Sequence, residues 1–379
     1  MSTALMLVAG LVLLVVGAEA LVRGASKIAA AFGIPPLVIG LTVVAFGTSA
    51  PELAVGIQSA LTGNADLALG NVIGSNIFNI LVIVGVSAVI VPLVVHQKLV
   101  RLDVPLVIVL SVLVFILGLD GRIGRVEGVL LFLGLAAFII FEVRQGRRES
   151  EEVRQEYARE YGDGRTKSAG QWALNLALLV GGLAMLILGS NWLVDSASSI
   201  ARSLGVSELI IGLTIVAAGT SAPELATSIM AALRGERDIA VGNAVGSNVF
   251  NLLGVLGLTA ALAPEGIGVP RSALVFDIPV MIAVAVAALP VFFTGYSISR
   301  WEGAVFLAYY VAYTLFLFLA ATEHDALRPY SLLMFVFVVP ITAITLLVLV
   351  VREVQLHRRG GSLLKPEPAL APDGEAPSG

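Results

Sequence analysis

Two glutamates of this chain lie in identical apolar surroundings. Glu52 and Glu224 each occupy the octapeptide Gly-Thr-Ser-Ala-Pro-Glu-Leu-Ala, and the apolar segments around them contain no Lys or Arg. An ionised carboxylate at the centre of a bilayer costs about 2.5–3.5 kcal/mol on insertion scales. Two carboxylates balance one divalent cation, and neighbouring hydroxyls and carbonyls can complete the 6–8 oxygen ligands that Ca²⁺ prefers. The pair therefore predicts a cation site.

The residues beside each glutamate supply further oxygens. Thr48 and Glu52 are four residues apart and share a helical face, with Ser49 beside them. Pro51 has no N–H, so it breaks the helix and frees backbone carbonyls near Gly47. At membrane depth, freed carbonyls must be satisfied by a cation or by water in a cavity. The second copy has the same residue types at Thr220, Ser221, Pro223 and Glu224.

A second polar motif follows each glutamate. Gly-Asn-x-x-Gly-Ser-Asn-x-Phe-Asn spans 70–79 and 242–251. Its Ser and last Asn are four apart and share a face: Ser75 with Asn79, and Ser247 with Asn251. These side chains are either oxygen ligands for ions or hydrogen-bond partners between helices. Because the chain has no Cys and these segments have no His, a transition-metal site is disfavoured.

Both motifs belong to one internal duplication. Residues 33–80 and 205–252 match at 29 of 48 positions, at a constant offset of 172 residues. Duplicated hydrophobic segments that are interrupted by Gly and Pro mark the binding site of many secondary transporters. The repeat motifs at 40–79 and 212–251 are therefore expected to face each other.

Composition places these motifs in a membrane. Hydrophobic residues make up 58% of the chain, charged residues 13%, and the mean hydropathy is +0.96. Soluble domains have about 25% charged residues, which excludes an ordinary soluble domain. Apolar runs of about 20 residues cross a bilayer. Eleven such spans are expected, at 3–22, 34–61, 67–94, 101–119, 125–144, 171–195, 206–232, 239–262, 272–293, 301–320 and 330–351.

The spans predict an all-α polytopic membrane protein with two inverted five-helix repeats and an additional C-terminal helix. The first repeat covers 1–144 and the second 169–321, joined by a charged cytoplasmic linker at 145–168. An additional membrane helix at 322–352 precedes a disordered cytoplasmic tail at 353–379. Because each repeat has an odd number of spans, the two enter the membrane from opposite faces.

Lys and Arg predict the orientation of the chain. With the N-terminus outside, 18 of the 23 basic residues fall on the inner side and 5 on the outer side. Basic residues accumulate in cytoplasmic loops. The expected topology thus has the N-terminus outside and the C-terminus in the cytoplasm, in the inner (cell) membrane.

The two duplicated motifs resemble those of the Ca²⁺:cation antiporter superfamily, particularly its prokaryotic Na⁺/Ca²⁺ exchanger branch, over residues 1–320. The resemblance implies that Glu52 and Glu224 are shared Ca²⁺ and Na⁺ ligands, with Thr48 and Thr220 at their sides. It implies that Na⁺ sites are lined by Ser49, Ser75, Ser221, Ser247 and the carbonyls of Ala45 and Ala217. Asn79 and Asn251 would lie at the centre of the site.

At two positions the sequence differs from other branches of the superfamily, and these differences bear on which ions are transported. Members that also carry K⁺, and some microbial exchangers, have Asp at the position of Asn251, so this chain lacks a third central acid, which argues against K⁺ cotransport. The H⁺/Ca²⁺ branch shows an acid in a Gly-Asn-Ala-x-Glu-type motif where this chain has Gly-Ser-Asn, which favours Na⁺ as the coupling ion.

The resulting expectation is a secondary antiporter that extrudes Ca²⁺ by alternating access, with Ca²⁺, Na⁺ and the lipid bilayer as its partners. It would be no enzyme, need no cofactor and bind no nucleic acid; a monomer would suffice, and the oligomeric state stays open. An H⁺/Ca²⁺ or other divalent-cation antiporter remains an alternative. A cation channel or an intramembrane carboxyl protease fits the duplicated motifs less well.

Overall fold

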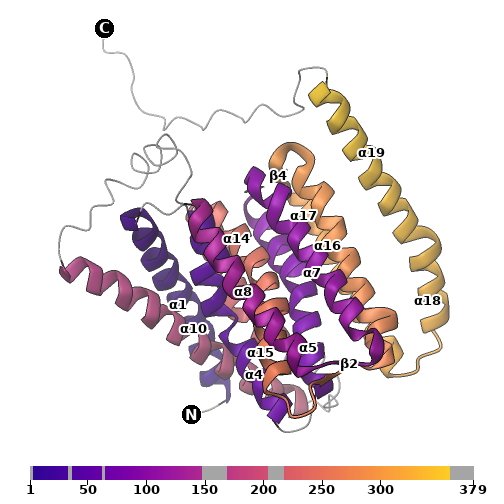
Figure 1. Cartoon of the computed structure of the whole chain (residues 1–379), viewed down its shortest axis with the longest axis horizontal. Helices are drawn as coiled ribbons and strands as arrows, with labels where there is room; N and C mark the ends of the chain where they lie inside the picture. Colours follow the sequence, from indigo (N-terminus) through magenta and orange to yellow (C-terminus); the bar gives the residue numbers. More distant parts are fainter. Residues whose placement is uncertain (1–2, 33–35, 62–64, 147–168, 204–216, 359–379) are drawn as a thin grey trace.

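The structure is a computed structural model that describes residues 3–32, 36–61, 65–146, 169–203 and 217–358. Most of the linker expected at 145–168, most of the tail expected at 353–379 and the start of the span expected at 206–232 lie outside these ranges. Figure 1 shows a bundle of long helices with α19 standing along one outer side.

The elements of the first repeat follow one another from the N-terminus. They are α1 (Thr3–Phe32), α2 (Pro36–Ile39), the π-helix η1 (Gly40–Val44), α3 (Ala45–Thr48), α4 (Ala50–Leu61), α5 (Ala65–Phe78), the π-helix η2 (Asn79–Val84), α6 (Gly85–Ile90), β1 (Leu93–Val94), the π-helix η3 (Leu99–Asp103), α7 (Val104–Leu117), the 3₁₀-helix η4 (Gly118–Asp120), β2 (Arg122–Ile123) and α8 (Arg125–Gly146).

From α12 onward, the described elements of the second repeat follow the same order as those of the first from α3 onward. The elements of the second repeat are α10 (Ala169–Ser203), α12 (Ala217–Thr220), α13 (Ala222–Leu233), α14 (Arg237–Val249), the π-helix η6 (Phe250–Val255), α15 (Leu256–Leu262), β3 (Ile267–Gly268), the π-helix η7 (Ala273–Asp277), α16 (Ile278–Phe293), the 3₁₀-helix η8 (Thr294–Tyr296), β4 (Ser297–Ile298) and α17 (Arg300–Ala321). The additional C-terminal segment comprises α18 (Leu327–Leu333), the π-helix η9 (Met334–Val338) and α19 (Val339–Arg358).

The membrane spans agree with the expected pattern. In the described part of the chain, nine helices are long and apolar enough to cross a bilayer, and a bent pair provides a tenth. The bent pair joins Leu37–Thr48 to Ala50–Ser59 at an angle of 43°. The bend falls between Gly47 and Pro51, where the sequence predicts it. In the second repeat, the same break separates α12 from the short apolar helix α13.

The helices that carry the Gly-Ser-Asn motifs form the centre of the bundle. The buried share of an 18-residue apolar window is 78% in the span Ala68–Ile90 and 83% in the span Arg237–Leu262. It is 39% or less in each of the other long spans. Exposed Val, Leu, Ile and Phe side chains cover the outer helices, as expected for surfaces that face lipid. The two central helices therefore position the site.

Two short antiparallel strand pairs tie the repeats together. β1 pairs with β4, with Leu93 opposite Ile298, and β2 pairs with β3, with Ile123 opposite Ile267. Each pair joins one strand from either repeat. Exchange of the repeats converts one pair into the other, which is the relation expected of two inverted repeats.

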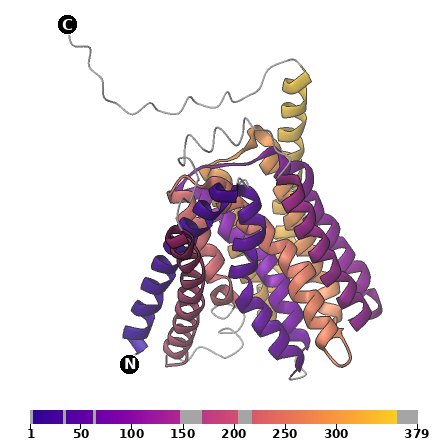
Figure 2. The same ribbon diagram turned by 60° about the vertical axis from the view of Figure 1, so that its left-hand side comes forward.

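Helices α1 and α10 form a long tilted pair along one side of the bundle, and they lie side by side in Figures 1 and 2. Glycines line their contact. A Cβ added to Gly17 would lie 2.8 Å from the Gly182 carbonyl oxygen, and one added to Gly10 would lie 2.9 Å from that of Gly189. Small residues at such positions let two helix backbones approach closely in a membrane.

Candidate functional site

The two glutamates occupy equivalent buried positions. Glu52 lies in the first turn of α4 and Glu224 in the first turn of α13, directly after the breaks at Ser49 and Ser221. Their exposed fractions are 0% and 1%. Both carboxylates are therefore shielded from solvent and lipid.

Each carboxylate contacts the break of the opposite repeat. The Ser49 hydroxyl donates to Glu224 Oε1 at 3.0 Å, and the Ser221 hydroxyl donates to Glu52 Oε1 at 2.9 Å. Since these contacts are reciprocal, the two glutamates belong to one site at the junction of the repeats. Ser221 also lies 3.2 Å from the Ser75 hydroxyl, which joins the central helix α5 to the site.

The threonines contact asparagines of the opposite repeat. Thr48 Oγ1 lies 3.2 Å from Asn243 Oδ1 and 3.1 Å from the Val44 carbonyl oxygen. Thr220 Oγ1 lies 3.5 Å from Asn71 Oδ1. Thr48 and Thr220 are both buried. The structure thus brings the Thr-Ser-x-Pro-Glu motif of each repeat against the Gly-Asn motif of the other.

Asn71 and Asn243 are site residues that the sequence analysis did not single out. Asn71 Nδ2 donates to the Glu52 carbonyl oxygen at 3.1 Å, and Asn243 Nδ2 donates to the Glu224 carbonyl oxygen at 3.2 Å. Asn243 also donates to the Ser228 hydroxyl at 3.0 Å. Both asparagines occupy the same place in the duplicated motif, and this repetition is the signal that could have identified them.

The two ends of the Asn79 amide have different surroundings. Its Nδ2 donates to Asn248 Oδ1 at 3.0 Å and so joins the two central helices. Its Oδ1 is buried and has no hydrogen-bond partner among the described residues. The amide nitrogen therefore holds helices together, while the amide oxygen is left free to bind an ion. Asn248 was not expected at the site, and its Nδ2 lies 3.4 Å from the Asn76 carbonyl oxygen.

Several buried oxygens of the two duplicated motifs lack hydrogen-bond partners among the described residues. They are Glu52 Oε2, Glu224 Oε2, Asn79 Oδ1, Asn251 Oδ1 and Ser247 Oγ. Buried polar atoms in native proteins nearly always have a partner, so such a set needs an explanation. An oxygen-seeking cation supplies one, because it binds all of these atom types.

The donor set is poor in acids. Within the described residues, no three His, Cys, Asp or Glu side chains form a group that could hold a metal ion. Two carboxylates and a surplus of neutral hydroxyl and amide oxygens suit a hard cation such as Ca²⁺ or Na⁺.

The structure gives fewer contacts for the two predicted backbone ligands, the carbonyl oxygens of Ala45 and Ala217. The Ala45 carbonyl oxygen accepts the Ser49 N–H at 3.0 Å and lies 3.4 Å from Thr48 Oγ1. Ala217, its counterpart, is the first described residue of α12. The structure thus places Ala45 on the turn before the break, with its carbonyl oxygen facing the Ser49 N–H and the Thr48 hydroxyl.

A family model described as sodium/calcium exchanger protein matches residues 2–144 and 174–319. The chain belongs to the sodium/calcium exchanger family. The matched ranges coincide with the two five-span repeats. The chain is therefore a multi-pass integral membrane protein from a family of transporters that carry out cation/Ca²⁺ antiport.

Relatives in bacteria and archaea extend the match over most of the chain. The putative antiporter CaxA of Alkalimonas amylolytica is 38% identical over 314 residues, which is 82% of this chain and 96% of CaxA. The sodium/calcium exchanger MaX1 of Methanosarcina acetivorans is 33% identical over 345 residues, or 83% and 98% of the two chains. The inner membrane protein YrbG of Escherichia coli is 38% identical over 70% of this chain and 81% of its own.

Solved structures of the sodium-calcium exchanger NCX_Mj have the same fold. One of them, soaked with Na⁺ and Ca²⁺, superposes with a TM-score of 0.69 at 29% identity and covers 82% of this chain and 96% of that chain. The two inverted repeats of this chain are consistent with that structure. The prediction of fold and family from the duplicated motifs is confirmed.

Proposed function

We propose that this family member exchanges Na⁺ for Ca²⁺ at one site between its two repeats, by alternating access. The ligands would be the Glu52 and Glu224 carboxylates, the hydroxyls of Thr48, Thr220, Ser49, Ser221, Ser75 and Ser247, the amides of Asn79 and Asn251, and the carbonyls of Ala45 and Ala217. Asn71 and Asn243 would position the glutamates through hydrogen bonds to the glutamates' backbone carbonyl oxygens.

The observation that carries this proposal is the reciprocal contact between each glutamate and the serine of the opposite repeat. It places two carboxylates in one buried site. One Ca²⁺ neutralises both, and Na⁺ ions can use subsets of the same oxygens. Competition for shared carboxylates couples the two ions, because an empty site with two unneutralised acids is too costly to reorient across the membrane.

Two features of the sequence support coupling to Na⁺ and independence from K⁺. Gly-Ser-Asn stands where the H⁺/Ca²⁺ branch has an acid, and Asn251 stands where members that also carry K⁺ have Asp. Asn79 and Asn251 contribute amides where an additional acid would favour a further cation. If more than two Na⁺ move per Ca²⁺, each additional charge responds to the membrane potential by about 2.3 kcal/mol per 100 mV. Inward Na⁺ would then drive Ca²⁺ out of the cell.

Transport by carboxylate variants tests the site. Glu52→Gln or Glu224→Gln keeps the side-chain shape but removes the charge that balances Ca²⁺. Either variant should abolish Na⁺-driven uptake of radioactive Ca²⁺ into proteoliposomes. Glu265→Gln, at an exposed loop position, is the matched control and should transport normally. Near-normal uptake by either site variant would refute the assignment.

Ion gradients test the coupling. Proteoliposomes loaded with Na⁺ should take up Ca²⁺ when diluted into Na⁺-free buffer, with and without K⁺. Uptake driven by a proton gradient alone would favour the H⁺/Ca²⁺ alternative, and uptake without any countertransported cation would favour a channel. Competition by Mg²⁺ and Mn²⁺ in the same assay defines the divalent selectivity.

A further inference from the structure

An ion pair joins α1 to the end of α13, the helix that carries Glu224. Arg234 directly follows α13, and two nitrogens of its guanidinium bind the Glu19 carboxylate of α1: Nε donates to Oε2, and Nη2 contacts Oε1. Paired contacts of this kind fix the geometry of an ion pair as well as strengthening it. Arg23 Nε, one turn further along α1, lies 2.6 Å from Oε1 of the same carboxylate. One carboxylate thus binds a cation of its own helix and a cation of α13.

The pair lies at membrane depth on α1 and away from the proposed ion site on α13. Glu19 belongs to the apolar span Thr3–Ile28. The side chains of Glu19 and Arg234 are 26% and 34% exposed. A charge in an apolar span is less well solvated than one in a loop, so it depends more on its partner. From Glu224 to Arg234 the chain advances about 15 Å at 1.5 Å per residue.

The second repeat has no equivalent ion pair. At the constant offset of 172 residues, Glu19 corresponds to Asn191, and Arg234 corresponds to Thr62. Both of these residues are neutral. Exchange of the two repeats would turn the contact between α1 and α13 into a contact between α10 and α4. At that place the sequence offers no pair of opposite charges.

The packing of the two halves differs in the same sense. Helix α1 packs along α13, whereas α10 makes no comparable contact with α4 in the described part of the chain. Helix α10 instead contacts α12, where the Ser190 hydroxyl donates to the Gly219 carbonyl oxygen. In transporters built from inverted repeats, one bundle rocks against the other around a fixed site to change access. The structure thus has the bundle closed along α13 and not along α4.

We propose that Glu19 and Arg234 form a latch that holds α1 against α13 and keeps the ion site closed to the face where α13 ends. The proposal rests on the alternating access proposed above. With the N-terminus outside, this face is the cytoplasmic one. Helices α1 and α10 move as one body, and α1 leaves α13 when the site opens to that face. Because only one repeat has the pair, the latch favours one access state over the other. Glu19 and Arg234 are positioning residues and are not among the proposed ligands.

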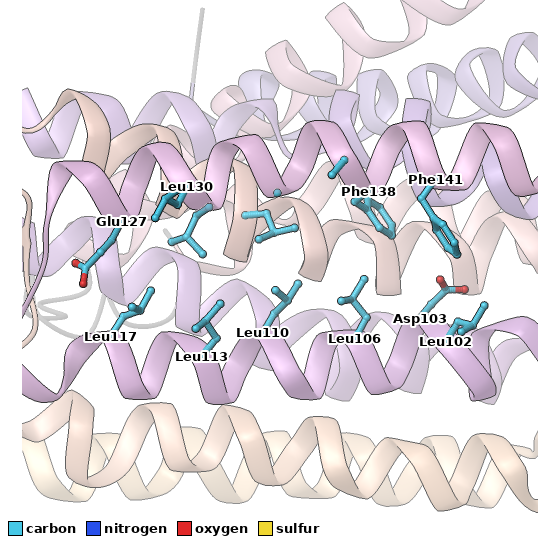
Figure 3. Close-up of a pocket in the computed structure, with 14 residues that line it drawn as sticks. Leu102, Asp103, Leu106, Leu110, Leu113, Leu117, Glu127, Leu130, Phe138 and Phe141 are labelled. Atoms are coloured by element: carbon cyan, nitrogen blue, oxygen red, sulfur yellow. The ribbon is translucent and has the colours of Figure 1, made fainter.

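Distances between two spin labels test the latch without any transport measurement. The chain has no cysteine, so Lys27→Cys on α1 and Arg101→Cys in η3 confine the labels to these two exposed positions. Arg101 precedes Leu102, which lines one end of the apolar groove between α7 and α8 (Figure 3). Double electron–electron resonance on the purified full chain in lipid nanodiscs gives the share of each distance. We expect one main distance when the latch is intact.

Variants of the two partners should change these shares. Glu19→Gln should raise the share of a second distance, relative to the main one, by about three- to tenfold, the range for a partly exposed bidentate ion pair. Arg234→Gln should do the same, and it carries the test if Glu19→Gln does not fold. Glu19→Arg with Arg234→Glu keeps two cations and one carboxylate at the contact and should restore the main distance. Unchanged distances in both single variants, or no recovery in the charge-swapped variant, would overturn the proposal.

Arg23→Gln is the matched control. It removes the contact within α1 and leaves the contact to α13 in place, so it should keep the main distance. A shift as large as that of Glu19→Gln would show that the contact between the helices is not what matters, and it too would overturn the proposal. Gel filtration and the thermal unfolding midpoint establish that each variant is folded.

Calcium uptake separates failure of the latch from failure of the proposed function. If the unlabelled parent chain shows no Na⁺-driven uptake, the proposed exchange fails, while the label distances still report the latch. If the parent chain transports and Glu19→Gln and Arg234→Gln keep its distances, only the latch fails. When both proposals hold, Glu19→Gln transports, and the Ca²⁺ concentration for half-maximal uptake falls at the face where α13 ends, because the state open to that face is more populated.

Discussion

Serine hydroxyls from the opposite repeat hold each buried carboxylate in place while leaving one of its oxygens free. Glu52 Oε1 and Glu224 Oε1 accept these hydroxyls, and the Oε2 atoms have no partner among the described residues. A buried carboxylate without any donor would be too costly to keep charged, and one that is fully satisfied would compete poorly for a cation. Half-satisfied carboxylates are what the proposed binding and release of an ion at this site requires.

Asn71 and Asn243, which donate to the backbone carbonyls of the glutamates, should contribute to the affinity for Ca²⁺. Asn243→Ala removes the donor to the Glu224 carbonyl oxygen and the partner of Thr48. Each unsatisfied buried group costs about 1–3 kcal/mol, and 1.4 kcal/mol is about tenfold in affinity. The Ca²⁺ concentration for half-maximal uptake should thus rise roughly tenfold or more. Ser111→Ala, which removes a buried hydroxyl from α7, is the control and should have no such effect. An unchanged half-maximal concentration in Asn243→Ala would contradict a positioning role.

At the scale of elements, glycines bring α1 and α10 close enough for their backbones to touch. A Cβ at Gly182 would lie 2.6 Å from the Leu21 nitrogen and 2.7 Å from the Gly17 carbonyl oxygen. The neighbouring Gly181 has open space at the same position. Close backbone packing of this kind favours movement of the two helices as one body. This packing is compatible with a pair that tilts across the site during alternating access.

Two adjacent glycines give a matched test of this contact. Gly182→Ala forces the helices apart and should lower the free energy of unfolding by about 1–3 kcal/mol, the usual cost of overpacking. Gly181→Ala should leave stability unchanged or raise it, because alanine favours the helix by up to about 1 kcal/mol. A thermal-shift assay of both variants measures the difference. Equal midpoints for the two variants would show that the close contact is absent.

At the scale of the whole molecule, two short strand pairs join the two repeats. The β1–β4 and β2–β3 pairs each take one strand from either repeat. The central helices α5 and α14 contribute to both halves of the site. Each glutamate meets a serine of the other repeat, so the proposed ion site needs both repeats.

The orientation of the chain in the membrane can be measured directly because the chain has no cysteine. Gln97 and Asp120 are exposed residues that flank α7 at opposite ends. With the N-terminus outside, Asp120→Cys should react with a membrane-impermeant maleimide added to whole cells. Gln97→Cys should react only after the membrane is opened. The reverse pattern would invert the topology that the positive charges predict.

The sequence determined the features that depend on neighbouring residues. The helical period places Thr48 beside Glu52 and Ser75 beside Asn79, proline fixes the position of each break, and apolar length gives the spans. The constant offset between motifs predicted two equivalent halves. These properties are set by local geometry, so they can be derived before any fold is known.

Only the tertiary structure decided which atoms face one another across the repeats. Ser49 lies 175 residues from Glu224, and Asn79 lies 169 residues from Asn248. Their contacts depend on how two inverted helix pairs cross, to which every side chain in the core contributes. A sequence shows that two segments are alike, but packing determines which atoms of one segment meet those of the other.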